Sequence, residues 1–336
     1  MRNVVGRRPR DSWYADPTSA NPAAVADLFA EALDVPTVDP DDDFFRLGGD
    51  SLLAETLLTT VERDFGAFLS ASALLDAPTP RALAALVARQ LRHGVSRCLM
   101  PIRPEGNGPP LFCLHGMNGH ITYGQSMVTV FGIERPIFAI RARGLRAGEK
   151  TTASVEACAA DYIREIRRVR PRGPYLLMAP CGPSIIAYEM AQQLTRAGEE
   201  VPGIALADPA VTDNAVWLRQ SGLARSLVQH RASRNLDRLR PAGTPALSGP
   251  ARAEAVLVAL ARAIRTYTPV PYSGRMLLLY SQEWSAGLLD PRHGFPSLVR
   301  DLRAIEVAPT HNDLQVDFRS RPAAAIRDFL QEVAPV

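Results

Sequence analysis

The sequence predicts two domains: a small all-helical bundle, followed by a larger α/β domain in which a helical insertion interrupts a largely parallel sheet. The 336 residues are 46% hydrophobic and 22% charged, a globular composition long enough for about two domains. Apolar residues recur at helical spacing up to residue 95, whereas short apolar runs alternate with helical stretches after residue 110. Prolines and glycines are concentrated between these two regions.

We divide the chain at these changes in composition. Residues 1–20 are expected to form a polar linker, 21–95 the helical domain, 96–110 an interdomain linker and 111–336 the α/β domain. In the first domain, one helix is expected from Pro22 to the proline and aspartate cluster at 36–43, and others at Ser51–Phe65 and Pro80–Leu91.

Six apolar runs in the second domain predict strands, and the segments between them predict covering helices. The strands are expected at Leu111–His115, Ile137–Ile140, Tyr175–Met178, Ile204–Ala207, Met276–Tyr280 and Ile305–Val307. The helices are expected at Ser154–Arg170, Pro183–Arg196 and Pro322–Glu332. The stretch at about 211–270 interrupts the alternation, and its length predicts a helical lid.

Several classes of protein are disfavoured. Four cysteines are too few for a disulfide framework and lack the spacing of metal ligands, so we expect free thiols and no metal. The N-terminus has no apolar signal segment, and no apolar run approaches the roughly 18 residues of a membrane span. Only Lys150 among the 38 basic residues is a lysine, a bias that fits GC-rich coding better than nucleic-acid binding. We therefore expect a cytoplasmic chain with no membrane or nucleic-acid partner.

The net charge of +3 conceals two oppositely charged halves. Residues 21–95 contain 12 acidic and 5 basic residues, whereas residues 96–336 contain 29 basic and 21 acidic residues. Such complementarity favours docking of the acidic domain on the basic one, mainly by aiding encounter and orientation.

The first domain contains the string DDDFFRLGGDSLL at 41–53. It resembles the phosphopantetheine attachment motif of acyl and peptidyl carrier domains, which implies a covalent 4'-phosphopantetheine on Ser51 and a phosphopantetheinyl transferase as partner. Because Ser51 begins a predicted helix, a phosphodiester there would meet free backbone N–H groups and the positive end of the helix dipole. The alternative is that Asp50 or Ser51 is only a helix N-cap.

In the second domain, YLLMAPCGPS at 175–184 runs from a buried strand into a helix, which is the context of a nucleophile elbow. Cys181 occupies the position of the serine in G-x-S-x-G, but Ala179 and Pro183 replace the usual glycines. Alanine is still small, and proline is tolerated in a first helical turn. The alternative is an inert buried cysteine.

Further elements follow in the chain order of the α/β-hydrolases. The HGMNG segment at 115–119 resembles an oxyanion loop, so the backbone N–H groups of Met117 and Gly182 are the candidate oxyanion donors. Asp208 follows a strand, and His311 follows the last strand, which makes them the candidate acid and base. Two acids after the intervening strand compete with Asp208, namely Glu283 and Asp290.

Together the two domains resemble the terminal peptidyl carrier and thioesterase didomain of a non-ribosomal peptide synthetase. The resemblance implies a small all-α four-helix carrier domain followed by an α/β-hydrolase domain with a helical lid insertion. It also implies upstream synthetase modules, docking of the carrier on the thioesterase in the same chain, and transfer of a peptidyl thioester from the arm on Ser51 to Cys181.

The cysteine is similar to that of a subset of these thioesterases that close four-membered rings, including the sulfazecin-type enzymes that form monobactams. This resemblance implies β-lactam formation. Hydrolytic, β-lactone-forming or macrocyclising release and a non-catalytic carrier module remain alternatives. Arginines in the expected lid could bind an anionic peptide, such as an N-sulfonated one, or could form a solvated or carrier-docking face. They include Arg219, Arg225, Arg231, Arg234 and Arg238.

Overall fold

In a computed structural model of the protein, the chain divides into two compact units, Met1–Ser96 and Arg97–Val336. The structure describes residues 20–65, 67, 69, 71–92, 98–121, 135–145, 149–209, 249–286, 292, 294–311 and 321–336. Within these ranges, no helix is long and apolar enough to cross a membrane, and no group of three His, Cys, Asp or Glu side chains could hold a metal ion. The expected linker at 1–20 lies outside them, apart from Ala20.

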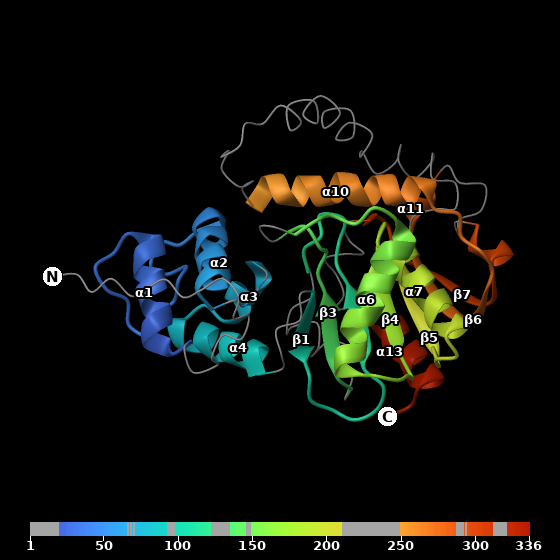
Figure 1. Ribbon diagram of the computed structural model, residues 1–336, viewed down its shortest axis with the longest axis horizontal. Helices are drawn as coiled ribbons and strands as arrows, with labels where there is room; N and C mark the ends of the chain where they lie inside the picture. The colour runs from blue at the N-terminus through green and yellow to red at the C-terminus, as the bar shows by residue number, and fades with distance from the viewer. Residues whose placement is uncertain are drawn as a thin grey trace. The chain divides into compact units, whose positions relative to one another are not determined.

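The first unit consists of helices around a small apolar core. Its described helices are α1 (Pro22–Leu33), α2 (Ser51–Phe65), α3 (Ala71–Asp76) and α4 (Pro80–Arg92) (Figure 1). Helix α1 packs against α2 and α4, and Phe29 meets Phe44 edge to face with ring centroids 5.3 Å apart. Helix α3 was not predicted from the sequence, because six residues are too few to show a helical period.

In its described residues, the second unit contains a seven-stranded mixed sheet of order β1-β3-β2-β4-β5-β6-β7. Its strands are β1 (Leu99–Arg103), β2 (Leu111–Leu114), β3 (Ile137–Ile140), β4 (Leu176–Pro180), β5 (Gly203–Ala207), β6 (Tyr272–Ser281) and β7 (Val299–Ala308). The strand β1 pairs antiparallel with β3, and the other pairs are parallel. Strands β2 to β5 are buried along their whole length, which explains why they appear in the sequence as short apolar runs.

Strand β1 corrects the sequence analysis, because it lies inside the segment 96–110 that we expected to be a linker. The prolines of that segment suggested a break in structure. An edge strand tolerates proline, since only one of its sides forms a ladder of hydrogen bonds, and Pro101 pairs with Phe138 in the register of β1 with β3.

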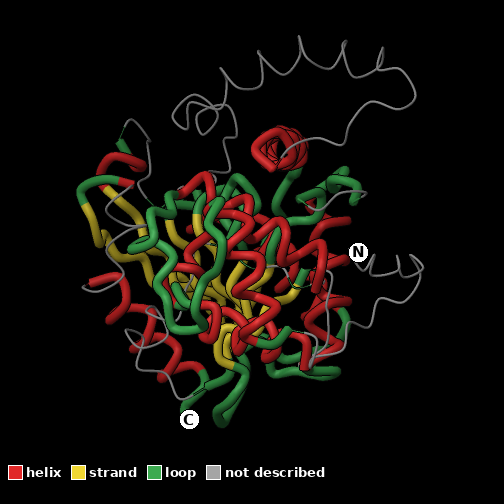
Figure 2. The backbone as a smooth tube through the Cα atoms, turned by 90° about the vertical axis from the view of Figure 1, so that its left-hand side faces the viewer, coloured by secondary structure: helices red, strands yellow, loops and turns green. Residues whose placement is uncertain are grey.

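Helices cover both faces of this sheet. Helices α6 (Val155–Val169) and α7 (Ser184–Arg196) pack side by side on one face, and α13 (Arg321–Val333) covers the other (Figure 1). Figure 2 shows helices on both sides of the strands. A Cβ atom added at Gly203 of β5 would lie 2.7 Å from the ring of Phe329 in α13. The absence of a side chain at this position therefore lets the helix approach the sheet closely.

The expected insertion is described only from residue 249 onward, as helix α10 (Gly249–Thr266) and the segment that follows it. In this helix Val256 lies against Gly119 and Gly144, which belong to the loops after β2 and β3. Beyond it, the Val270 carbonyl accepts hydrogen bonds from Tyr188 Oη at 2.7 Å and Gln192 Nε2 at 3.1 Å, both in α7. The C-terminal end of the insertion is thus tied to the helix that begins after Cys181.

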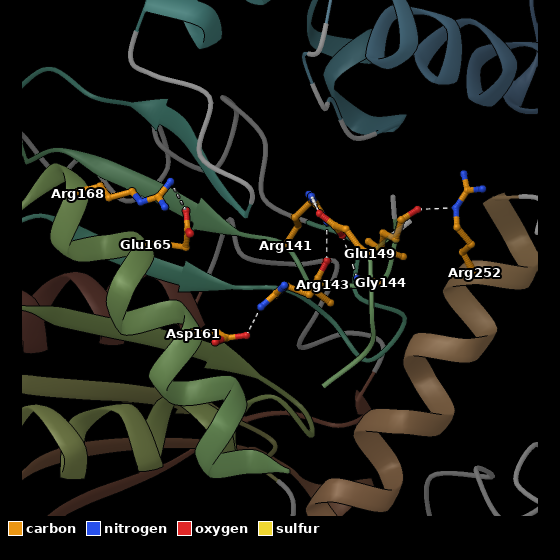
Figure 3. A network of polar contacts seen from close by, with 10 residues as sticks. Arg141, Arg143, Gly144, Glu149, Asp161, Glu165, Arg168 and Arg252 are labelled. Carbon is orange, nitrogen blue, oxygen red and sulfur yellow. Dashed lines mark hydrogen bonds and ion pairs between the residues drawn. The ribbon is translucent and has the colours of Figure 1, made fainter. Parts of the chain in front are cut away.

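A buried ion pair supports the loop beneath α10 (Figure 3). The guanidinium of Arg141 donates to both oxygens of Glu149, at 2.6 and 2.8 Å, and the Gly144 N–H donates to Glu149 Oε2 at 3.0 Å. From α10, Arg252 Nε donates to the Leu145 carbonyl at 2.5 Å. The network therefore links Gly144 and Leu145, which follow β3, to Glu149 and to α10.

Candidate active site

Cys181 lies in the sharp turn between β4 and α7, with a backbone φ of +51°. A left-handed conformation costs a non-glycine residue about 1–2 kcal/mol and persists only where its surroundings impose it. Here the Cys181 N–H donates to the Ala207 carbonyl at 2.7 Å, and the Cys181 carbonyl accepts from the Ser184 N–H at 3.1 Å. The turn forms despite Ala179 and Pro183, the two residues that depart from the usual glycines.

Asp208 follows β5, the strand next to β4, and its side chain is fully buried. Its N–H donates to the Leu279 carbonyl of β6 at 2.8 Å, and its φ is +42°. Ser281 at the end of β6 gives its N–H to Asp208 Oδ1 at 2.8 Å and its hydroxyl to Oδ2 at 2.7 Å. These bonds satisfy a buried carboxylate and fix its orientation.

His311 follows β7, and its Nδ1 donates to Asp208 Oδ2 at 2.7 Å. The imidazole also shares a hydrogen bond with the Cys181 side chain. Burial by itself lowers the pKa of His311, but its hydrogen bonds to Asp208 and Cys181 and its electrostatic attraction to both side chains outweigh burial and raise the pKa to about 10. The structure thus joins Cys181, His311 and Asp208 in one continuous set of side-chain contacts.

The structure describes one of the two acids that compete with Asp208. Glu283 binds the backbone of His311 and not its ring, since Glu283 Oε2 accepts from the His311 N–H at 3.0 Å. Asp290 lies outside the described residues. The acid that contacts the imidazole is therefore Asp208, as expected from its position after β5.

The two expected oxyanion donors follow β2 and β4. Met117 lies in a turn closed by hydrogen bonds from the Gly119 N–H to the Gly116 carbonyl and from the Gly116 N–H to the His120 carbonyl, both at 3.0 Å. Gly182 directly follows Cys181. Within the described residues, the backbone N–H groups of Met117 and Gly182 donate to no protein acceptor.

Ser281 and Trp284, which contact the candidate acid and the candidate base, were not predicted from the sequence. Trp284 stacks on His311, with ring centroids 4.4 Å apart and planes inclined by 21°. No local pattern marks either residue, because their partners lie far away in sequence. The predicted lid arginines, Arg219, Arg225, Arg231, Arg234 and Arg238, lie outside the described residues.

In the first unit, Ser51 is the first residue of α2. Asp50 caps this helix, since its Oδ1 accepts from the N–H groups of Leu52 and Leu53, each at 2.9 Å. A Cβ atom added at Gly48 would meet nothing within 4 Å, and Leu52 is 69% exposed. An open approach to a helix N-terminus fits a phosphodiester group. The N–H groups of Leu52 and Leu53 are not free as expected, however, because Asp50 already accepts from both.

Two family models match the chain. The model described as "Phosphopantetheine attachment site" matches residues 23–87, and the "Thioesterase domain" model matches residues 109–289. The first match indicates that the chain carries a covalently attached 4'-phosphopantetheine.

Known proteins resemble the chain in sequence and in fold. It is 36% identical over 205 residues to a dimodular nonribosomal peptide synthase of Bacillus subtilis, and 29% identical over 328 residues to malpinin synthetase of Mortierella alpina. These alignments cover 61% and 93% of the chain, but the chain spans only 8% and 4% of the two relatives.

Among solved structures, a four-domain nonribosomal peptide synthetase bound to AMP and glycine gives a TM-score of 0.57 at 21% identity, covering 100% of this chain and 27% of that one. The thioesterase domain of NocB from the nocardicin cluster gives a TM-score of 0.54 at 21% identity, covering 71% and 99%. These similarities support a carrier domain followed by an α/β-hydrolase domain. The thioesterase family model matches more than half of the residues of this chain. The chain therefore belongs to the thioesterase domain family.

Proposed function

We propose that this chain is the carrier and thioesterase end of a nonribosomal peptide synthetase and that it releases a peptide by intramolecular cyclisation, forming a β-lactam. In this proposal Cys181 is the nucleophile, His311 the general base and acid, and Asp208 the residue that orients His311. The main support is the connection from Cys181 through His311 to Asp208 Oδ2, where the Nδ1 to Oδ2 distance is 2.7 Å.

The first step is transfer of an acyl group from a thioester substrate to Cys181. His311 holds the proton released by the Cys181 thiol, and the sulfur attacks the thioester carbonyl carbon. When the tetrahedral species collapses, the bond to the departing thiol breaks and His311 returns the proton to that thiol. Asp208 supports this cycle because its carboxylate holds Nδ1 as a donor, so that Nε2 is the nitrogen that exchanges the proton.

The negative charge that develops on the carbonyl oxygen needs nearby donors. We assign this role to the N–H groups of Met117 and Gly182, which have no protein acceptor within the described residues. Donors of this kind stabilise a transition state because they are already oriented before charge develops.

We assign attachment of the 4'-phosphopantetheine to Ser51. This group supplies a thiol that carries the acyl chain as a thioester. The N-terminus of α2 favours the phosphodiester electrostatically, and capping by Asp50 already satisfies the N–H groups of Leu52 and Leu53. The acidic carrier domain would then dock on the basic thioesterase domain in the same chain.

The second step closes the ring. An amide or sulfamate nitrogen of the bound peptide attacks the carbonyl carbon on Cys181, so that a C–N bond forms and the C–S bond breaks. His311 takes the nitrogen proton and delivers it to the Cys181 sulfur. A cysteine suits this step because exchange of one thioester for another retains acyl-transfer potential, whereas transfer to serine would give a more stable ester.

The remaining partners also belong to the proposal. Upstream synthetase modules would supply the peptidyl group, a phosphopantetheinyl transferase would modify Ser51, and both reactions would take place in the cytoplasm. Arginines among residues 219–238 would bind an anionic group of the peptide, since guanidinium matches the geometry of carboxylate and sulfonate.

The test uses the full chain loaded with a peptidyl thioester of defined sequence. We expect intact-protein mass spectrometry to show an acyl adduct that Cys181→Ala abolishes and that Cys158→Ala, a buried matched control, retains. The released product should have a mass one water below that of the linear acid, and fragmentation should place the new bond within a four-membered ring.

Other results would select other functions. Linear acid alone would remove cyclisation and leave a hydrolytic thioesterase, and a larger ring or a β-lactone would identify a different attacking group. Absence of any adduct in the wild-type chain would indicate a non-catalytic carrier module. An adduct that persists in Cys181→Ala would refute the assignment of the nucleophile.

A further inference from the structure

The one-turn helix α11 (Gln282–Ser285) contacts the candidate base, and its N-cap residue Ser281 binds the candidate acid. Its Trp284 is buried and stacks on the imidazole of His311, at a centroid distance of 4.4 Å. At its other edge, Trp284 Nε1 donates to the carbonyl of Pro209 at 3.1 Å. Because Pro209 directly follows Asp208, the indole bridges the two segments that carry the acid and the base.

Ser281 forms the N-cap of the same helix and connects it to the carboxylate. Its Oγ accepts from the Trp284 N–H at 3.2 Å and donates to Asp208 Oδ2 at 2.7 Å, the oxygen that also binds His311. Glu283 completes the contact through the backbone, because its N–H donates to the Pro309 carbonyl at 2.9 Å and its Oε2 accepts from the His311 N–H at 3.0 Å.

We propose that Trp284 is a positioning residue that holds the ring of His311 and favours its protonated form, and that Ser281 holds Asp208 in the matching orientation. The inference rests on the roles that the proposed function assigns to Asp208 and His311. The face of a neutral indole ring carries partial negative charge and attracts a cation placed over it more strongly than a neutral imidazole. The stacked geometry also limits rotation of the imidazole about its Cβ–Cγ bond.

The charged neighbours of His311 act in the same direction. Cys181 reaches it from the turn before α7 and Asp208 from the end of β5, and both raise its pKa against the opposing effect of burial. Glu283 of α11 binds the His311 backbone. We expect removal of the indole face to lower the pKa of His311 by about one unit, a size typical of a partly desolvated cation over an aromatic ring.

The experiment measures the rate of iodoacetamide alkylation of Cys181 against pH, with the modified peptide quantified by mass spectrometry. This readout needs neither a peptidyl substrate nor a loaded carrier. Burial raises the pKa of Cys98 and Cys113 to about 12 and that of Cys158 to about 11, so these thiols should react slowly and serve as internal references.

In the wild-type chain we expect a profile with two steps, of which the upper reports loss of the imidazolium proton. His311→Ala should leave a single step. Trp284→Leu should shift the upper step down by about one pH unit, whereas Trp284→Phe, which keeps an aromatic face but loses the Nε1 donor, should shift it less. Ser281→Ala should also lower the upper step, because it removes a hydrogen bond that orients Asp208.

The outcomes separate this inference from the proposed function. A wild-type profile identical to that of His311→Ala would refute the Cys181–His311 pair and the inference with it. A two-step profile that is lost in His311→Ala but unchanged in folded Trp284→Leu, Trp284→Phe and Ser281→Ala chains would overturn only the positioning role. If Trp284→Leu does not fold, the other two variants decide, since Trp284→Phe empties less of the space that the indole fills and Ser281→Ala empties none of it.

Discussion

The Tyr162 hydroxyl donates a hydrogen bond to His115 Nε2 at 2.7 Å, and both side chains are completely buried. The other ring nitrogen, Nδ1, lies 2.7 Å from the Gly116 carbonyl oxygen. Because a carbonyl can only accept, Nδ1 carries the proton and Nε2 is the acceptor, so the neutral ring satisfies both partners. Burial lowers the pKa of His115 to about 4.

This pair predicts sensitivity to acid. A histidine whose pKa is lower in the folded state binds fewer protons than in the unfolded state, so its contribution is present above pH 6.5 and is lost as the pH falls towards 4. We expect the wild-type chain to lose about 2 kcal/mol of stability from this group between pH 7.5 and pH 5. Urea unfolding followed by near-UV circular dichroism would measure the loss.

Two variants separate the effect of protonating His115 from the effect of its hydrogen bond with Tyr162. His115→Phe should be less stable at neutral pH but should lack this pH dependence, whereas Tyr162→Phe should retain it, since the histidine stays buried. An equal dependence on pH in His115→Phe and in the wild-type chain would show that the acid sensitivity arises elsewhere.

His311 predicts the opposite pH dependence. Its pKa is raised in the folded state to about 10, so its contribution to stability is complete below pH 6.5 and is lost as the pH rises towards 10. In Asp208→Asn the pKa of His311 should fall by more than one unit, because the hydrogen bond to a charged carboxylate and the negative charge of Asp208, which oppose the effect of burial, are removed. Nitrogen NMR of the histidine rings would measure this.

Glu283→Gln is the matched control, since Glu283 binds only the backbone N–H of His311 and an amide oxygen can accept the same bond. It should leave the pKa of His311 nearly unchanged. A fall as large as that in Asp208→Asn would mean that Glu283 also acts on the ring.

Substitution of the neighbouring residues Gly48 and Gly49 by alanine should lower the stability of the first unit by different amounts. A Cβ atom at Gly49 would lie 2.3 Å from the ring of Phe44 and 2.7 Å from its carbonyl oxygen, so Gly49→Ala should destabilise the first unit by about 2–3 kcal/mol. Gly48 has a φ of +96° but open space around it, and Gly48→Ala should cost about 1 kcal/mol. Hydrogen exchange in α1 and α4 of the full chain would measure both, and equal effects would contradict the clash with Phe44.

Because Arg141 and Glu149 form an ion pair, removing one partner alone should lower the stability of the fold (Figure 3). Glu149→Gln leaves a buried guanidinium poorly compensated and should cost about 3 kcal/mol. Hydrogen exchange in α10 should increase as well, since Arg252 binds the loop that Glu149 supports. The double variant Arg141→Met with Glu149→Met should lose less stability than Glu149→Gln alone. If the loss in the double variant equals the sum of the losses in Arg141→Met and Glu149→Met made singly, this account is contradicted.

Much of the fold could be predicted because its elements have local signatures. The apolar runs at β2 to β5 and the periodic stretches at α2, α6 and α7 depend on neighbours within one element. Strand β1 and helix α3 have no such signature. The former is a short edge strand that contains Pro101, and the latter is a single short helix, so packing against the rest of each unit determines them.

The same distinction applies to the candidate site. The sequence by itself determined that Cys181 lies between a strand and a helix, that Asp208 and His311 follow later strands, and that Ser51 begins a helix, because these positions depend on periodicity and chain order. Only the tertiary structure decided that Asp208, 103 residues from His311, is the acid that binds its ring, and that Trp284 and Ser281 hold the two. Such contacts depend on the side-by-side order of β4, β5, β6 and β7 in the sheet, which brings distant strand ends together.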